Sequence, residues 1–220
     1  MNYKEILNKI EIQLKGEAHL DELARKKQDS FKILISTVLS ARTRDANTRL
    51  ATDRLFSRFN NPKAIVEADI EEIEQLIKPS GFYRVKAARI KEVSQVLLDK
   101  YNGEVPNEYE KLIRLPGVGS KTANCVLVYA FKIPAIPVDT HVHRISNRLK
   151  WVRTKNPLQT EEALKEVIPR ELWLKINRLF VRFGQEVCLP INPNCDICII
   201  QNICPKDFSM EISKKKNKKK

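Results

Sequence analysis

The sequence has no apolar run that approaches the roughly 18 residues needed by a membrane-spanning helix. The first residues, Met1–Leu7, lack the apolar segment of a signal peptide, so we expect no secretory leader. No stretch alternates apolar and polar residues with a period of two, and no internal repeat occurs. We therefore expect a cytoplasmic protein, without strands, in which thiols stay reduced.

Acidic residues are outnumbered by basic ones: the sequence has 27 Asp and Glu and 40 Lys and Arg, which gives a net charge of +13. Residues 213–220 contain six of the lysines, so the rest of the chain carries +7. A basic body indicates a polyanionic partner, with nucleic acid before an anionic membrane, although lysines can simply aid solubility. We expect the tail, residues 209–220, to be disordered.

Apolar residues recur instead at the three- and four-residue spacing of amphipathic helices. This spacing is seen at Tyr3, Ile6, Leu7, Ile10 and Leu14; at Phe31, Leu34, Ile35, Val38 and Leu39; and at Leu172, Ile176, Leu179, Phe180 and Phe183. Ser30, Asn107 and Ser120 are predicted N-caps, and Asp69–Glu72 resembles a capping box. Residues 133–138 contain two prolines and are predicted to be an extended connector. The sequence therefore predicts an all-α fold.

Four of the five cysteines lie close together near the C-terminus, at Cys188, Cys195, Cys198 and Cys204. Four thiolates from one short loop can bind a [4Fe–4S] cluster or a tetrahedral zinc ion. Zinc sites more often pair two C-x2-C knuckles, whereas only one such pair occurs here, so the spacing favours iron–sulfur without excluding zinc. Cys125 lies in an apolar helical stripe and is predicted to be a core residue.

A tight turn between two amphipathic helices predicts a helix–hairpin–helix at about residues 107–131. Its turn residues are Leu115, Pro116, Gly117, Val118, Gly119 and Ser120. The glycines would let backbone N–H groups approach an anion, and the following helix N-terminus adds a favourable dipole. Such a unit can hold a DNA phosphate independently of sequence, although a plain helical turn is the simpler interpretation.

Two residues near this hairpin could carry chemistry. Lys121 falls in the first helical turn, where the helix dipole disfavours a cation, and a neutral amine is a nucleophile. Taken alone, Lys121 is more simply interpreted as an exposed lysine. Asp139 precedes another helix and could be only an N-cap, or could stabilise positive charge developing on a sugar. His141 and His143 are predicted to point to different helix faces, which disfavours a metal site with Asp139.

The segments 115–124 and 138–141, followed by the four-cysteine loop, together closely resemble the endonuclease III branch of the helix–hairpin–helix DNA glycosylases. The resemblance covers residues 30–205 and implies a [4Fe–4S] cluster on the four cysteines. It also implies two helical domains flanking a DNA-binding cleft: a six-helix domain, residues 22–134, with the hairpin, and residues 1–21 with 135–208 around the cluster loop, 188–204.

The same resemblance implies a bifunctional DNA glycosylase/AP lyase of base excision repair. Lys121 matches the Schiff-base lysine and Asp139 the catalytic aspartate, and the hairpin turn and His141 fall among the DNA-binding positions. Arg42 stands where relatives place a glutamine that fills the vacated base stack. Phe82 stands where they place an aliphatic wedge, although an anchoring role in the core is the alternative.

The expected substrates are double-stranded DNA with oxidised pyrimidines and abasic sites, cut by β-elimination by a monomeric enzyme near the nucleoid. One rival is a monofunctional T:G or A:G mismatch glycosylase of the same superfamily, and another is a non-catalytic DNA-binding iron–sulfur module. Relatives with mismatch activity generally lack the lysine that this chain has at position 121. The interval 189–194 also departs from the family, because it contains no cation for phosphate contact.

Overall fold

The computed structural model describes residues 2–14, 19–26 and 29–209. Throughout these ranges the chain forms helices, turns and irregular segments with no strand, so the all-α prediction is confirmed. No helix within them is both long and apolar enough to cross a bilayer. Apart from Ser209, the predicted basic tail lies outside the described residues.

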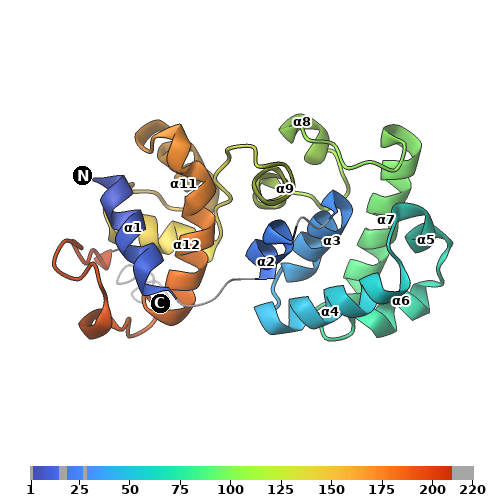
Figure 1. Ribbon diagram of the computed structural model, residues 1–220, viewed down its shortest axis with the longest axis horizontal. Helices are drawn as coiled ribbons and strands as arrows, with labels where there is room; N and C mark the ends of the chain where they lie inside the picture. The colour runs from blue at the N-terminus through green and yellow to red at the C-terminus, as the bar shows by residue number, and fades with distance from the viewer. Residues whose placement is uncertain (1, 15–18, 27–28, 210–220) are drawn as a thin grey trace, which may run out of the picture. The chain divides into compact units, whose positions relative to one another are not determined.

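The chain divides into two compact units (Figure 1). The central unit is Glu17–Ile133, and the terminal unit combines Met1–Gly16 with Pro134–Lys220. The predicted division placed the first boundary after residue 21. The structure places it earlier because helix α2 (His19–Arg25) packs on α3, α4 and α9 of the central unit.

The central unit contains eight helices in its described part, rather than the six that were predicted. They are α2 (His19–Arg25), α3 (Ser30–Ser40), α4 (Asp45–Arg58), α5 (Pro62–Glu67), α6 (Ile70–Ile77), α7 (Tyr83–Tyr101), α8 (Tyr109–Leu112) and α9 (Ser120–Phe131). Helix α3 packs on both α4 and α9, and α5 and α6 pack on α7. The predicted stripe of α3 is buried, as is Cys125 on α9, which confirms the core prediction for that thiol.

Three predicted caps lie elsewhere. Asp29, not Ser30, is the N-cap of α3, because its carboxylate accepts a hydrogen bond from the N–H of Phe31 at 3.3 Å. Helix α8 begins after Glu108 rather than Asn107, and α9 begins after Gly119 rather than Ser120. Each of these three helices therefore begins one residue away from its predicted start.

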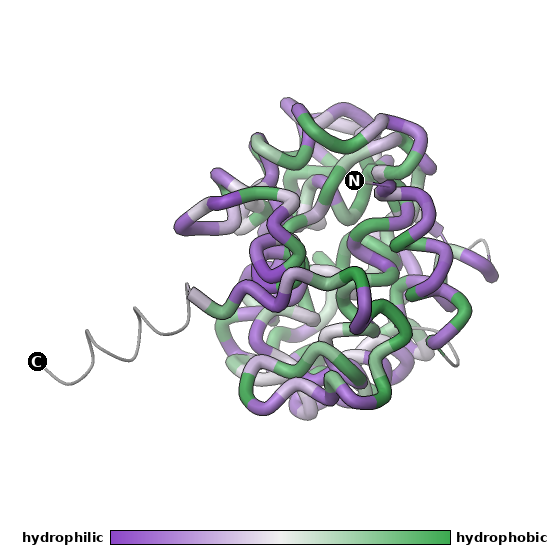
Figure 2. Tube along the Cα trace, turned by 90° about the vertical axis from the view of Figure 1, so that its left-hand side faces the viewer, coloured by the Kyte–Doolittle hydropathy of each residue, from purple (hydrophilic) through white to green (hydrophobic). Residues whose placement is uncertain are grey.

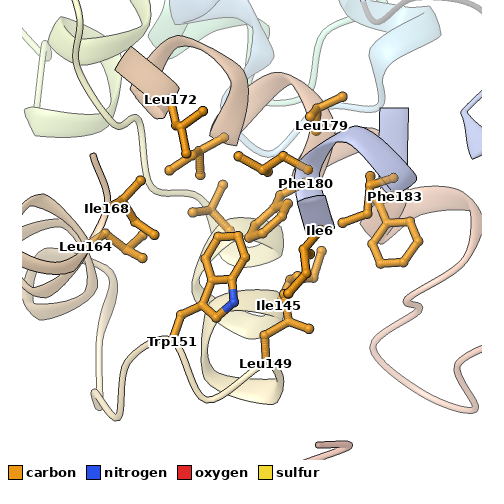
Figure 3. Close-up of a cluster of buried hydrophobic side chains, with 14 of the residues drawn as sticks. Ile6, Ile145, Leu149, Trp151, Leu164, Ile168, Leu172, Leu179, Phe180 and Phe183 are labelled. Atoms are coloured by element: carbon orange, nitrogen blue, oxygen red, sulfur yellow. The ribbon is translucent and has the colours of Figure 1, made fainter. Parts of the chain in front are cut away.

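The terminal unit is built from α1 (Tyr3–Gln13), α10 (Thr140–Arg148), α11 (Pro157–Val167), η1 (Arg170–Leu172), α12 (Trp173–Glu186) and η2 (Cys195–Ile197). Its core gathers large apolar side chains from α1, α10, α11 and α12 (Figure 3). The Trp151 ring lies between Tyr3 and Phe180, with centroids 5.1 Å from each. Hydrophobic and hydrophilic stretches alternate along the chain trace, as amphipathic helices require (Figure 2).

Candidate active site and cysteine loop

The predicted hairpin joins α8 to α9 through a turn whose apolar side chains anchor it to the central unit. Leu115 and Val118 are buried, and the N–H of Val118 donates to the carbonyl of Leu115 at 3.1 Å. Gly117, which lies between these two buried residues, and Gly119, which follows Val118, are both exposed. The turn therefore presents its glycine backbone outward, as a backbone phosphate contact requires.

The two glycines of the turn have different structural roles. Gly117 has φ +67°, and a Cβ there would lie 2.6 Å from Cδ and Nε of Arg89 on α7. Gly119 has extended backbone (φ −95°), and a Cβ there would meet no atom within 4 Å. The positive φ and the Arg89 contact thus favour glycine at position 117, whereas position 119 has open space in front of it.

Lys121 is the second residue of α9 and is half-buried. In the described chain no side chain caps this helix, because the cap position is held by Gly119. The amides of the first turn therefore surround the start of the lysine side chain with partial positive charge. This is the placement expected from the sequence.

Asp139 is the N-cap of α10, in the terminal unit. Its Oδ1 accepts hydrogen bonds from the N–H groups of His141 (2.9 Å) and Val142 (2.8 Å). The capping interpretation is confirmed, and it leaves room for chemistry because both bonds use one carboxylate oxygen. Lys121 and Asp139 belong to different units, which the irregular segment after α9 connects.

The two histidines of α10 have different neighbours. His141 Nδ1 lies 3.1 Å from a terminal nitrogen of Arg144, and burial lowers the pKa of His141 although Asp139 opposes this shift. A neutral His141 can accept a hydrogen bond from Arg144. His143 instead meets the Thr160 hydroxyl on α11 at 2.6 Å. As predicted, the two imidazoles face different directions.

Arg42 and Phe82 lie together in the central unit. The Arg42 guanidinium lies 5.7 Å from the centroid of the Phe82 ring. Both residues have left-handed backbone, with φ of 51° and 58°. The anchoring role considered for Phe82 is wrong, because 63% of its surface is exposed. An exposed aromatic ring paired with a cation fits the predicted role in base displacement.

The four C-terminal cysteines line one hollow of the terminal unit, whose apolar wall includes Ile145 and Phe183. Burial raises the pKa of the Cys198 and Cys204 thiols, and the neighbouring cysteines raise it further. As the side chains stand in the described residues, no three of them converge closely enough to form a metal-binding group. Cys188, Cys198 and Cys204 nevertheless pack against the same core, and a cationic centre would offset the mutual repulsion of their thiolates.

Two arginines of α10 hold the first cysteine and the loop that follows it. Arg148 donates to the carbonyls of Leu189 (2.7 Å) and Pro190 (3.1 Å) and to Sγ of Cys188 (3.2 Å). Arg144 donates to the carbonyl of Cys188 at 2.8 Å. Neither contact was predicted from the sequence. The i, i+4 spacing of the two arginines, on one face of α10, was the available signal.

Residues 35–170 match the HhH-GPD superfamily of base excision DNA repair proteins. The chain belongs to this family. Endonuclease III of Thermotoga maritima is 51% identical over 195 residues, which cover 84% of this chain and 92% of that protein. Endonuclease III of Escherichia coli K12 is 40% identical over 79% of this chain and 82% of its own length. These identities place the chain in the endonuclease III group.

Other relatives are longer or differ in activity. The chain matches 64% of the Bos taurus Endonuclease III-like protein 1, at 42% identity over 88% of this chain. A trapped Endonuclease III–DNA covalent intermediate superposes with TM-score 0.77 at 40% identity, covering 85% of this chain and 92% of that one. A thermostable thymine-DNA glycosylase superposes with TM-score 0.78, covering 91% of this chain and 92% of that one, at 25% identity. Fold alone therefore does not separate these two activities.

Proposed function

We propose that this member of the endonuclease III group excises oxidised pyrimidines from double-stranded DNA and cuts 3′ to the abasic site, with Lys121 as the nucleophile. The placement of Lys121 in the first turn of α9, directly behind the hairpin, carries the proposal. A solved relative is described as a trapped Endonuclease III–DNA covalent intermediate, and covalent trapping requires a nucleophile on that enzyme.

The proposed reaction uses the amine of Lys121 as the nucleophile and the carboxylate of Asp139 to stabilise positive charge. The neutral Lys121 amine forms a bond to C1′ of the flipped-out nucleotide, while the base leaves with the electron pair of the glycosidic bond. Loss of one proton from the amine nitrogen is followed by opening of the sugar ring, in which the C1′–O4′ bond breaks and O4′ takes up a proton. The product is an iminium ion, which makes the 2′-proton acidic. Removal of that proton breaks the C3′–O bond, and the 3′ phosphate leaves. Hydrolysis of the imine then returns Lys121.

Asp139 would stabilise positive charge on the sugar as the base departs. Its capping bonds support this role, because they fix the carboxylate at the start of α10 without a cationic side chain. His141, two residues along α10, is the proposed DNA contact from this segment. It is oriented by Arg144.

DNA would be held mainly through its phosphates. One phosphate can bind at the exposed backbone of Gly117 and Gly119, where the uncapped N–H groups of α9 can donate hydrogen bonds to it. This binding does not depend on the base sequence. The Phe82 ring would wedge into the stack and Arg42 would fill the space left by the flipped base.

Cys188, Cys195, Cys198 and Cys204 are the proposed ligands of a [4Fe–4S] cluster. The donor set fits, because four thiols line one hollow and a buried Arg148 lies against the first of them. When bound, the cluster would link the four cysteines and so hold their loop against the hydrophobic core of the terminal unit. We further propose that the protein acts as a monomer on the nucleoid in the cytoplasm; light scattering and cell fractionation test these two points.

Borohydride trapping tests the proposal. Wild-type protein should form a covalent complex with duplexes containing thymine glycol or an abasic site, and Lys121→Gln should not. Lys100→Gln, an exposed lysine at the end of α7, is the matched control and should trap like wild type. Normal trapping by Lys121→Gln would contradict the assignment.

A monofunctional mismatch glycosylase is the second candidate, favoured by the superposition on the thymine-DNA glycosylase. That activity uses water as the nucleophile and forms no covalent complex. Base release from T:G or A:G pairs with no trapping on any duplex would establish it in place of the bifunctional reaction.

A further inference from the structure

Lys86 on α7 is a buried lysine whose ammonium group lies among four oxygen atoms. Only 7% of its surface is exposed. Its Nζ lies within hydrogen-bond distance of the carbonyl oxygens of Leu39 and Ala41, each at 2.7 Å, and of the hydroxyls of Ser80 (2.8 Å) and Thr43 (2.9 Å), so its three N–H groups are shared among four acceptors. All four acceptors are neutral. The charge is therefore held by dipoles rather than by an ion pair.

These acceptors come from two parts of the chain that are far apart in the sequence: the end of α3 with the loop that follows it, and the loop before α7. Leu39 and Ala41 contribute carbonyls at the C-terminal end of α3, where the helix leaves carbonyls unpaired and its dipole favours a cation. Ser80 belongs to the loop before α7, and its hydroxyl also donates to the Leu39 carbonyl at 3.1 Å. The N–H of Gly81 donates to the Thr43 hydroxyl at 3.1 Å. Lys86 is thus the centre of a network that joins the loop at residues 41–44 to the loop at 79–82.

Each of these loops carries one of the residues assigned to base displacement. Arg42 and Phe82 both have left-handed backbone, which is unfavourable for a non-glycine residue. Such conformations persist where the surroundings over-determine them. The network around Lys86 fixes the residues on either side of Arg42 and just before Phe82, and so supplies that constraint.

We propose that Lys86 is a positioning residue, which locks the two loops together so that Arg42 and Phe82 enter the DNA as one preformed unit. The inference rests on the proposed glycosylase function and deepens it. A lysine is a costly choice for a buried site, because its charge must be desolvated. An apolar side chain would cost less free energy to bury, but it could not donate hydrogen bonds to acceptors in both loops.

Lys86→Met keeps the length of the side chain and removes every donor. Lys91→Met is the matched control, since Lys91 lies on the same helix and donates to one carbonyl, that of Ala68. Hydrogen exchange in the free protein should become faster at residues 41–44 and 80–82 in Lys86→Met and stay at the wild-type rate in Lys91→Met. Unchanged exchange in both variants would overturn the proposal, whatever the enzyme activity.

Single-turnover kinetics test the functional part. Excision of thymine glycol needs the base to be displaced, whereas a preformed abasic site has no base to remove. Lys86→Met should lose about tenfold in excision and much less in cleavage of an abasic site, because positioning errors act on the displacement step. Lys86→Arg, which keeps donors, should recover part of the loss. Equal losses on both substrates would indicate a merely structural role and would overturn the proposal, while inactivity of the wild type on both would instead refute the proposed function.

Discussion

The side chain of Arg89 lies directly over Gly117, at the point where a Cβ would fall 2.6 Å from its Cδ and Nε atoms. This contact couples α7 to the hairpin turn within the central unit. Together with the positive φ of Gly117, it favours glycine at position 117 for a reason internal to the protein, separate from any approach of DNA.

Alanine substitution at the two hairpin glycines should therefore have different effects. Gly117→Ala must adopt a positive φ and displace Arg89, so we expect a loss of about 1–2 kcal/mol in the free energy of unfolding. Gly119→Ala should unfold like wild type, because its Cβ enters open space, but should weaken binding to an abasic-site analogue. Denaturant unfolding and fluorescence anisotropy measure the two effects. Equal stability of both variants would contradict the assigned role of Gly117.

Substitutions of Asp139 separate capping from catalysis. Asparagine is as good an N-cap as aspartate, so Asp139→Asn should keep its stability while excision falls, because the negative charge is lost. Asp139→Ala should lose about 1 kcal/mol of stability as well. Thermal unfolding beside single-turnover excision provides the comparison. Full activity in Asp139→Asn would show that the residue is only a cap.

Lys86 should make stability depend on pH in alkaline solution. Burial lowers the pKa of Lys86 to about 8 in the folded protein, from 10.5. Between these values the unfolded chain keeps the proton that the folded protein releases, so raising the pH favours the folded state. Wild type should gain up to about 1.4 kcal/mol per pH unit relative to Lys86→Met across this window, and nothing below it. Urea denaturation at several pH values measures the gain, and a constant difference between the proteins up to pH 10 would argue against a lowered pKa.

Arg148 should determine how firmly the cysteine loop is held. Arg148→Gln removes donors to the carbonyls of Leu189 and Pro190 and to Sγ of Cys188. Protein purified anaerobically with iron should then lose it faster to a chelator, as followed by visible absorption. Arg153→Gln, at a side chain that is 81% exposed, is the control and should lose iron at the wild-type rate. Equal rates of iron loss in the two variants would show that Arg148 does not help to hold the cysteine loop.

The sequence was informative where local pattern determines structure. The helical spacing of apolar residues predicted the buried face of α3, and Asp139 was recognised as a cap because a carboxylate can bind the next free amides. The hairpin was placed correctly, with its helix starting one residue before Lys121.

Contacts between distant segments could not be predicted in the same way. Nothing in the residues around Lys86 indicates that its ammonium would meet carbonyls 45 and 47 positions away. Phe82 was left between a core role and an exposed one, because an aromatic residue in a turn suits either; the left-handed backbone before α7 turns it outward. The first boundary between the units lies earlier than predicted for a similar reason, since the packing of α2 depends on partners beyond its own sequence.

Mass spectrometry of the borohydride-trapped complex after digestion would identify the nucleophile itself. We predict a reduced sugar adduct on the peptide that contains Lys121, with the added mass located at that side chain. An adduct on another lysine or on the N-terminal amine, with Lys121 unmodified, would contradict it.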